Sequence, residues 1–469
     1  MIIILLVYLR IVLNKRKNNL FRGHMKFEII AILTILLLSM GTISSVMSLE
    51  FESNTIHKDE FDILQVTASD LEGDGNYEIL AYTAGKKFLC LDDKGNIKWT
   101  LESNNSFSMM KVMDVYDLPG NEIILGTENR VVSQKEIYNA LVYFLDAEGN
   151  EIVTIPILGS VLDVDIGDVD SNGTYETLVG ADDGNVYFFD EGLNLLWDYK
   201  TRGYNFRTLI VDLNEDGINE IMIISWDNTL ILDGLGKLTK SYDTKHILRE
   251  LYLDRYNNMI HVSRFFREDS QNWKGTVVYS LNRNLASMWE FRTETESSAS
   301  TLFDVNNDLR DEVIIAGNKG EIIVLDSKGV FLKRFDLPDR IFKIEVMADE
   351  NTNYIIAGCK DNNLYVIDYN TGNVEFKFET QGWVESFYIS DINKDGKQDI
   401  IVGSNDNKVY LLLQKKEIVE SPEEENKTVI DKPSEEQPKS ETKNVPFEEV
   451  GIIGGTLLGS IYLALRKRR

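Results

Sequence analysis

Oxygen-bearing side chains at alternate positions mark the segment DINKDGKQDIIVG, which covers Asp391–Gly403. Counted from Asp391, Asp or Asn occupies positions 1, 3, 5 and 9, and Gly396 occupies position 6. Carboxylates this close repel one another unless a cation lies between them. Oxygen ligands at positions 1, 3 and 5, a glycine at the sharp turn and a main-chain carbonyl at position 7 allow a short loop to wrap calcium. The segment therefore predicts a calcium-binding loop.

The predicted loop joins two strands. A helix-loop-helix calcium hand needs Glu at position 12, where this chain has Val402. The flanking residues alternate between apolar and polar side chains, as strands do. We therefore expect the carboxylate at position 9, here Asp399, to serve as the far-side ligand.

The acidic loop belongs to a repeat. Related segments begin at residues 70, 168, 212 and 304, and a decayed copy begins at residue 114. Successive starts, with residue 391 as the last, lie 44, 54, 44, 92 and 87 residues apart, so each of the two long gaps is about twice the shortest. Two further units are therefore expected near residues 254 and 347. Segments 251–263 and 346–358 keep the apolar flanks there and lose the acidic pattern.

The repeat predicts an all-β propeller over residues 49–416. Each unit contains four short apolar runs separated by turn signals, which is typical of antiparallel strands. Four-stranded units repeated at this spacing form propeller blades. Eight starts predict eight blades, and seven blades with one degenerate unit is the alternative. The eighth unit lacks a fourth strand, so we expect Ser48–Ser53 to complete it and close the ring, which removes exposed strand edges.

The acidic loops resemble the FG-GAP/VCBS repeats of integrin-α-like propellers, whose loops bind calcium between the first and second strands of a blade. The resemblance covers about residues 49–414, whereas third and fourth strands such as NNLYVIDYNTGNVEFKF (Asn362–Phe378) look like quinoprotein propeller repeats. It implies several structural calcium ions. The implied ligands are Asp70, Glu72, Asp74, Asn76 and Glu78; Asp168, Asp170, Asn172, Thr174 and Glu176; Asp212, Asn214, Asp216, Ile218 (by its carbonyl) and Glu220; Asp304, Asn306, Asp308 and Glu312; and Asp391, Asn393, Asp395, Lys397 and Asp399.

Two copies of the loop depart from the pattern. Leu309 replaces the glycine in the loop that begins at Asp304, which makes its turn costlier. In the copy at Asp114, Tyr116 and Leu118 replace ligands, so calcium binding is not expected there. The alternative for every loop is that Asp and Asn only form turns through their own side chains.

Both ends of the chain predict export and anchoring. Basic residues, an apolar run and small residues within 1–48 are typical of a signal peptide, with 1–24 as an extension and an uncleaved anchor as the alternative. Residues 417–449 are rich in Glu, Lys, Ser and Pro, which predicts an extended stalk. Residues 450–469 predict a short transmembrane anchor with a basic cytoplasmic tail. Stalk, VPFEE and anchor resemble the sorting tails of archaeal surface proteins, with simple membrane retention as the alternative.

Composition limits the function. The net charge of -27 argues against nucleic-acid binding. The four histidines have no zinc-ligand spacing, and the two cysteines, Cys90 and Cys359, are expected to be buried free thiols.

We therefore expect a calcium-binding, membrane-anchored module for adhesion or other interactions at the cell surface, with a protein or glycan partner. Aromatic residues in loops opposite the calcium face, namely Phe107, Tyr204, Phe265, Trp273 and Trp383, are the candidate ligand contacts, with packing on the rim as the alternative. No nucleophile–base arrangement stands out in the sequence, so we do not expect an enzyme. The alternatives are a quinoprotein dehydrogenase-like enzyme, a calcium-dependent polysaccharide lyase and a surface-layer scaffold.

Overall fold

The computed structural model describes residues 49–415, except 116–119, 134–135, 227, 245–246, 257, 268–272 and 350–351. The predicted signal peptide, stalk and anchor lie outside these residues. Within the described part of the chain, no helix is long and apolar enough to cross a membrane.

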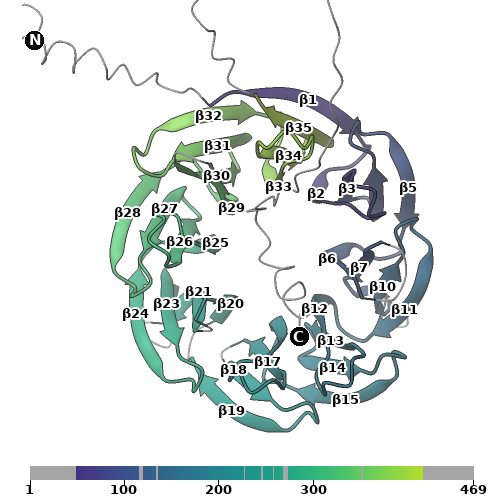
Figure 1. Ribbon diagram of the computed structural model, residues 1–469. Coiled ribbons are helices and arrows are strands. Elements are labelled where there is room, and N and C mark those ends of the chain that lie inside the picture. Colours follow the sequence, from purple (N-terminus) through teal and green to yellow (C-terminus); the bar gives the residue numbers. More distant parts are fainter. Residues whose placement is uncertain are drawn as a thin grey trace, which may run out of the picture. The chain divides into compact units, whose positions relative to one another are not determined.

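The described strands form eight antiparallel blades in a ring (Figure 1). Blade 1 consists of β2 (Ile63–Ser69), β3 (Glu78–Thr83), β4 (Lys87–Leu91) and β5 (Ile97–Glu102), and blade 2 of β6 (Phe107–Met113), β7 (Glu122–Thr127), β10 (Ala140–Leu145) and β11 (Glu151–Ile157). Blade 3 consists of β12 (Val161–Gly167), β13 (Glu176–Ala181), β14 (Asn185–Phe189) and β15 (Leu195–Lys200). Blade 4 consists of β16 (Asn205–Val211), β17 (Glu220–Ser225), β18 (Asn228–Leu232) and β19 (Leu238–Asp243).

Blades 5 to 8 complete the ring. Blade 5 consists of β20 (Ile247–Leu253), β21 (Met259–Arg267), β23 (Thr276–Leu281) and β24 (Ser287–Thr293), and blade 6 of β25 (Ser297–Phe303), β26 (Glu312–Gly317), β27 (Glu321–Leu325) and β28 (Phe331–Asp336). Blade 7 consists of β29 (Ile341–Ala348), β30 (Asn353–Cys359), β31 (Asn363–Asp368) and β32 (Val374–Glu379). Blade 8 consists of β33 (Val384–Ser390), β34 (Asp399–Ser404), β35 (Lys408–Gln414) and the N-terminal strand β1 (Phe51–Lys58). The prediction of eight four-stranded blades is confirmed, and the seven-bladed alternative is wrong.

Two insertions add short strands to this plan. β8 (Arg130–Ser133) and β9 (Glu136–Tyr138) form a hairpin between β7 and β10, and β22 (Trp273–Lys274) pairs with β21 in blade 5.

Burial follows the position of a strand within its blade. All six residues of β13 and of β26 are buried, because both faces of a blade pack against neighbouring blades. The fourth strands β15 and β28 expose alternate residues at the rim. The core consists of eight hydrophobic clusters, each shared by two adjacent blades, so that blade 8 packs on blade 1 as any other pair does.

The N-terminal strand closes the ring, as predicted. β1 pairs antiparallel with β35, from Phe51 opposite Gln414 to Lys58 opposite Lys408. The strand begins later and extends further than the expected Ser48–Ser53. Phe51 is its buried anchor, with its ring 4.8 Å from that of Phe376.

Candidate metal sites and the opposite face

The five predicted calcium loops share one backbone structure at the turn between the first and second strands of blades 1, 3, 4, 6 and 8, on one face of the ring. In each, the carboxylate at position 1 accepts a hydrogen bond from the main-chain N–H at position 6: 2.8 Å from Gly75 to Asp70, 3.0 Å from Gly173 to Asp168, 2.8 Å from Gly217 to Asp212, 2.8 Å from Leu309 to Asp304 and 2.9 Å from Gly396 to Asp391. The loop at Asp304 therefore adopts the common turn without its glycine, and Leu309 has φ +67°.

Position 4 of these loops is also left-handed, which sequence reasoning missed. The residues there are Gly73, Ser171, Glu215, Asn307 and Lys394, with φ between 58° and 69°. Four of the five are not glycine, so composition carries no signal for this turn.

The carboxylate at position 9 has a structural role besides the predicted ligand role. It accepts a hydrogen bond from the N–H at position 2, as in Glu176 from Val169 (2.8 Å). The decayed copy keeps this bond, because Glu122 accepts from Val115 at 2.7 Å. Its replaced ligand positions, Tyr116 and Leu118, lie outside the described residues. The bond therefore belongs to the blade fold, and a metal ion is not required to explain it.

The loop at Asp168 has the arrangement that best fits a metal ion. One carboxylate oxygen each from Asp168, Asp170 and Glu176 lies within 4.8 Å of the others. Three oxygens no more than 4.8 Å apart lie within about 2.8 Å of a common centre, and calcium takes oxygen ligands at about 2.3–2.6 Å, so a small movement of the side chains lets a single ion contact all three. Burial raises the pKa of Glu176, and the charges of Asp170 and Asp168 raise it further. A bound cation would offset this repulsion.

Asp399 is held differently in the last loop. Its Oδ2 accepts N–H groups of Ile392 (3.1 Å) and Asn393 (3.3 Å), and its Oδ1 accepts that of Gln414 (2.9 Å). Burial raises its pKa to about 6. The shorter Asp thus uses both oxygens in backbone contacts, whereas Glu176 uses one oxygen for Val169.

A lysine occupies the loop of blade 1. Lys98 lies on the fourth strand, β5, and donates to Glu78 Oε1 at 2.9 Å and to the Glu72 carboxylate. Glu78 holds position 9 of the loop and Glu72 holds position 3. Burial alone would lower the pKa of Lys98, but the hydrogen bonds and charges of Glu72 and Glu78 raise it. Asp70 Oδ1 is buried without a hydrogen-bond partner. Two predicted ligands in this loop are therefore already paired with the chain's own ammonium group.

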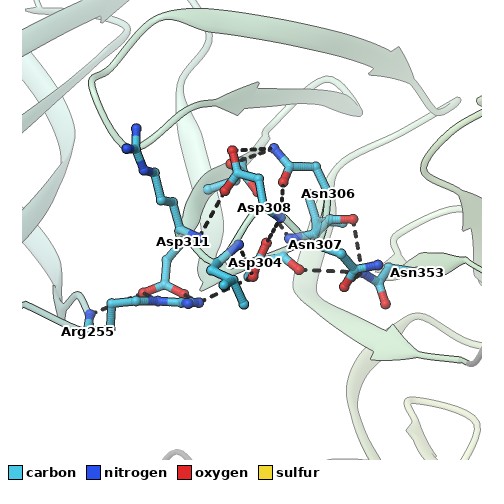
Figure 2. Close-up of polar contacts among 11 residues, drawn as sticks. Arg255, Asp304, Asn306, Asn307, Asp308, Asp311 and Asn353 are labelled. Carbon is cyan, nitrogen blue, oxygen red and sulfur yellow. Dashed lines mark hydrogen bonds and ion pairs between the residues drawn. The ribbon is translucent and has the colours of Figure 1, made fainter.

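An arginine from blade 5 contacts the loop at Asp304 (Figure 2). Arg255 Nη2 lies 2.7 Å from Asp311 Oδ1 and 3.5 Å from Asp304 Oδ2. The Asn306 amide donates to Glu312 Oε1 at 2.9 Å. Burial, with the charge of Asp308, raises the pKa of Glu312 to about 7. This loop therefore has internal partners for several of the oxygens that were predicted to bind calcium.

The opposite face carries the start of each first strand and the turn between the second and third strands. Tyr204 and Trp383 lie there and are 45% and 41% exposed. Phe107 is buried, so its predicted ligand role is wrong; its ring fills the core between blades 1 and 2. Phe265 lies on β21 and Trp273 on β22, but their side chains are not among those that the structure describes.

Sequence reasoning missed three aromatic neighbours on that face. The Trp226 ring lies 5.5 Å from that of Tyr204 and 6.3 Å from that of Phe206. The Phe342 ring stacks on Trp383 at 5.7 Å. In the sequence each of these three is only an aromatic residue near a strand end, a pattern too common to identify a binding residue.

Charged side chains on first strands form a second feature that sequence reasoning missed. Lys111 Nζ on β6 lies 3.2 Å from Asp163 and 3.6 Å from Asp165 on β12, and Arg207 on β16 lies 3.9 Å from Asp163. Burial raises the pKa of Asp165. The available signal was a charge inside an apolar first strand, as in the segment SMMKVM.

The cysteines are free and buried, as predicted. Burial raises the pKa of the Cys90 thiol to about 12, and it raises the pKa of Cys359 too.

Comparisons with known proteins support the fold. The family model described as the lambda-carrageenase beta-propeller domain matches residues 45–158 and 299–383. This match does not confirm the resemblance to FG-GAP/VCBS repeats or to archaeal sorting tails. No curated protein sequence matches this chain.

Three solved structures share the architecture at low sequence identity. Sqt1 of Saccharomyces cerevisiae has a TM-score of 0.58 at 13% identity, covering 78% of this chain and 98% of its own. The computationally designed Ika8 protein has 0.56 at 12%, covering 76% and 98%. BamB from Moraxella catarrhalis has 0.52 at 14%, covering 78% and 99%. The chain therefore carries an eight-bladed β-propeller domain.

Proposed function

We propose that this protein is a calcium-stabilised propeller that serves as a binding module at the cell surface. The observation that carries the calcium proposal is the convergence of Asp168, Asp170 and Glu176 oxygens within 4.8 Å. The recurrence of the same turn in four other blades supports it. The ions would be structural: they would neutralise clustered carboxylates and hold the turn between two strands.

The five loops should differ in affinity. The loop at Asp168 has no described lysine or arginine bound to its ligands, and the loop at Asp212 keeps Gly217 with the same hydrogen bonds. Lys98 at the first loop and Arg255 at the loop of blade 6 compete with an ion. In the loop at Asp212, however, the Asn214 amide donates to Glu220, as the Asn306 amide donates to Glu312 in blade 6. We therefore assign the strongest binding to the loop at Asp168.

The experiment is thermal or urea unfolding of the full chain in chelator and in calcium. Extracellular calcium modules bind with a Kd of about 10⁻⁴–10⁻³ M. At about 10 mM calcium and a Kd of about 0.3 mM, mass action adds about 2 kcal/mol per site. A control series with magnesium separates site binding from ionic strength. An unfolding midpoint that is equal in chelator and calcium would overturn the proposal.

The surface location rests on the sequence of the two ends. Signal peptide, stalk and anchor lead us to place the propeller outside the membrane, with the last four residues inside. Protease treatment of intact cells tests this, because an outward-facing stalk would be cut while the cells remain sealed. A stalk that stays uncut on intact cells and is cut only after the cells are lysed would refute it.

The face opposite the calcium loops is the proposed binding surface. Tyr204 and Trp383 extend from loops at strand ends there, where they are not needed to fill a core. Aromatic residues in such positions commonly dominate contacts with a partner. The partner would be a protein or a glycan.

A second candidate function is an enzyme that acts on a polysaccharide. The family-model match to a carrageenase propeller favours it, as does the group of Lys111, Asp163, Asp165 and Arg207 on first strands. Incubation with lambda-carrageenan, followed by assays for new reducing ends and for unsaturated products, separates a hydrolase from a lyase. Activity lost in Asp165→Asn and retained in Asp198→Asn, an acidic change on the rim strand β15, would support catalysis. No product from the wild type would leave the binding module as the better proposal.

A further inference from the structure

The opposite face carries a compact cluster that combines aromatic rings with unpaired cations at the junction of blades 7 and 8. Trp383, which directly precedes β33, is 41% exposed, and its ring stacks on Phe342 at 5.7 Å with 26° between the planes. Lys360 Nζ lies 5.1 Å from the Trp383 ring centre, and Arg340 Cζ lies 4.9 Å from that of Phe342. These contacts link the four side chains into one cluster, here called the blade 7–8 patch.

The backbone beneath Trp383 is rigidly built. The Thr380 hydroxyl lies 2.6 Å from the Gly382 carbonyl oxygen and 3.0 Å from that of Asn362. A Cβ on Gly382 would approach the Asn405 carbonyl carbon to 2.4 Å, so only glycine fits there. The Asn405 N–H donates to the Trp383 carbonyl at 2.9 Å. The exposed indole is therefore presented on a fixed corner, which reduces the entropy lost when a ligand binds.

The same corner occurs in blade 4. The Thr201 hydroxyl lies 2.8 Å from the Gly203 carbonyl oxygen, and Tyr204 follows as an exposed aromatic residue beside Trp226. The segments TRGY (Thr201–Tyr204) and TQGW (Thr380–Trp383) thus form the same turn, each with an exposed aromatic residue at its last position. The two copies differ in charge. In blade 4, Arg202 is paired with Asp243 at 3.3 Å, whereas the cations of the blade 7–8 patch lack such a partner.

The cations of the patch are available for a ligand. Among the described residues, neither Arg340 nor Lys360 lies within 4.0 Å of a carboxylate oxygen, and the buried Nε atom of Arg340 has no hydrogen-bond partner. The adjacent acids are engaged elsewhere: Asp339 Oδ1 accepts the Arg340 N–H at 2.7 Å, and Asp361 accepts the Tyr365 hydroxyl. Lys360 and Arg340 can therefore present charged N–H donors to an anionic ligand.

We propose that the blade 7–8 patch binds an acidic polysaccharide, with a sugar ring packed on Trp383 and its sulfate or carboxylate held by Lys360 and Arg340. The apolar C–H face of a pyranose fits a flat, exposed indole. Guanidinium and ammonium groups form charge-assisted hydrogen bonds with anions. This proposal deepens the binding-module function above by naming the ligand class.

The test measures binding of defined polysaccharides to the purified full chain by calorimetry and by tryptophan fluorescence. The probes are chondroitin sulfate for sulfate, polygalacturonate for carboxylate and dextran as the neutral control. We expect binding of one or both acidic polymers, weakened by added salt, and none of dextran. Trp383→Ala and Lys360→Gln should each weaken it at least tenfold.

Matched controls make the result specific. Tyr256→Ala removes an exposed aromatic residue and Lys94→Gln removes an exposed lysine, both on the calcium side of the ring; neither should change binding at the blade 7–8 patch. Unfolding curves verify that each variant is folded. No binding of either acidic polymer, equal binding of dextran, or undiminished binding by folded Trp383→Ala would overturn the proposal. Calcium binding is measured on the same samples, so its failure would be recorded separately from failure of the patch.

Discussion

Replacing Lys98 by leucine should convert the loop of blade 1 into a better calcium site. Lys98 and Leu196 hold equivalent places, because each lies in the irregularity of its fourth strand just before a tryptophan, Trp99 or Trp197. Leu196 is exposed in blade 3 beside the loop at Asp168, so leucine is compatible with this place in the fold. The substitution removes the ammonium group from Glu72 and Glu78 and leaves the turn intact.

The magnitude follows from the two ion pairs that calcium must break in the wild type. The side chains of Lys98, Glu72 and Glu78 are 30%, 37% and 6% exposed, so each pair lies near the upper end of the range for accessible pairs, about 1 kcal/mol. Displacing both costs about 2 kcal/mol, which weakens calcium binding about 30-fold. In chelator, the variant should lose about the same stability, because Glu72 and Glu78 then repel each other without a cation.

The assay compares urea unfolding of wild type and Lys98→Leu in chelator and in about 10 mM calcium, with bound ions counted by native mass spectrometry. The variant should be less stable than wild type in chelator, recover in calcium, and bind one additional ion. The reciprocal change Leu196→Lys is the matched control and should weaken the loop at Asp168. If Lys98→Leu responds to calcium as the wild type does and binds no additional ion, the reasoning is refuted.

Three further predictions address the turn, the position-9 carboxylate and the closing strand. Leu309→Gly should stabilise the protein by about 0.5–1 kcal/mol in urea unfolding, because Leu309 has φ +67° and is 73% exposed, so it loses strain and little packing; a loss of stability would contradict this. Glu176→Gln should remove one bound calcium, whereas Glu122→Gln, in the copy without a predicted site, should remove none; both keep an oxygen for the N–H at position 2, and equal ion counts would refute the assignment. Phe51→Ala should cost about 3 kcal/mol, since it empties a buried place against Phe376; a cost under about 1 kcal/mol would show that β1 is dispensable for closure.

The blade count could be read from the sequence because the acidic loop recurs at nearly constant spacing and apolar runs mark the buried strands. The full length of β1 could not, since it runs along the rim and most of its residues are exposed, so the segment FESNTIHK lacks an apolar pattern. The left-handed turn at Ser171 and Lys394 was hidden for a similar reason: neither residue type signals that conformation.

The candidate sites divide in the same way. Ligand spacing lies within one loop and is local, so the sequence contains it. The contact of Lys98 with Glu72, and that of Arg255 with Asp304, join separate strands or blades, and their existence depends on tertiary packing. Phe107 shows the converse: it begins β6, directly after a turn between blades, and its ring lies in the core, which only the packing decides.

Ring closure by β1 has a consequence for the order of synthesis. β1 is among the first parts of the propeller to leave the ribosome, yet its partner β35 is the last strand to be made, and Glu50 and Lys415, which meet beside this junction, are 365 residues apart. Until β35 arrives, β1 has no strand to pair with and the facing surfaces of blades 1 and 8 remain uncovered. Contacts this distant in sequence form slowly. A chain that stops anywhere before β35 cannot bury those surfaces, so closure also distinguishes a finished propeller from a truncated one.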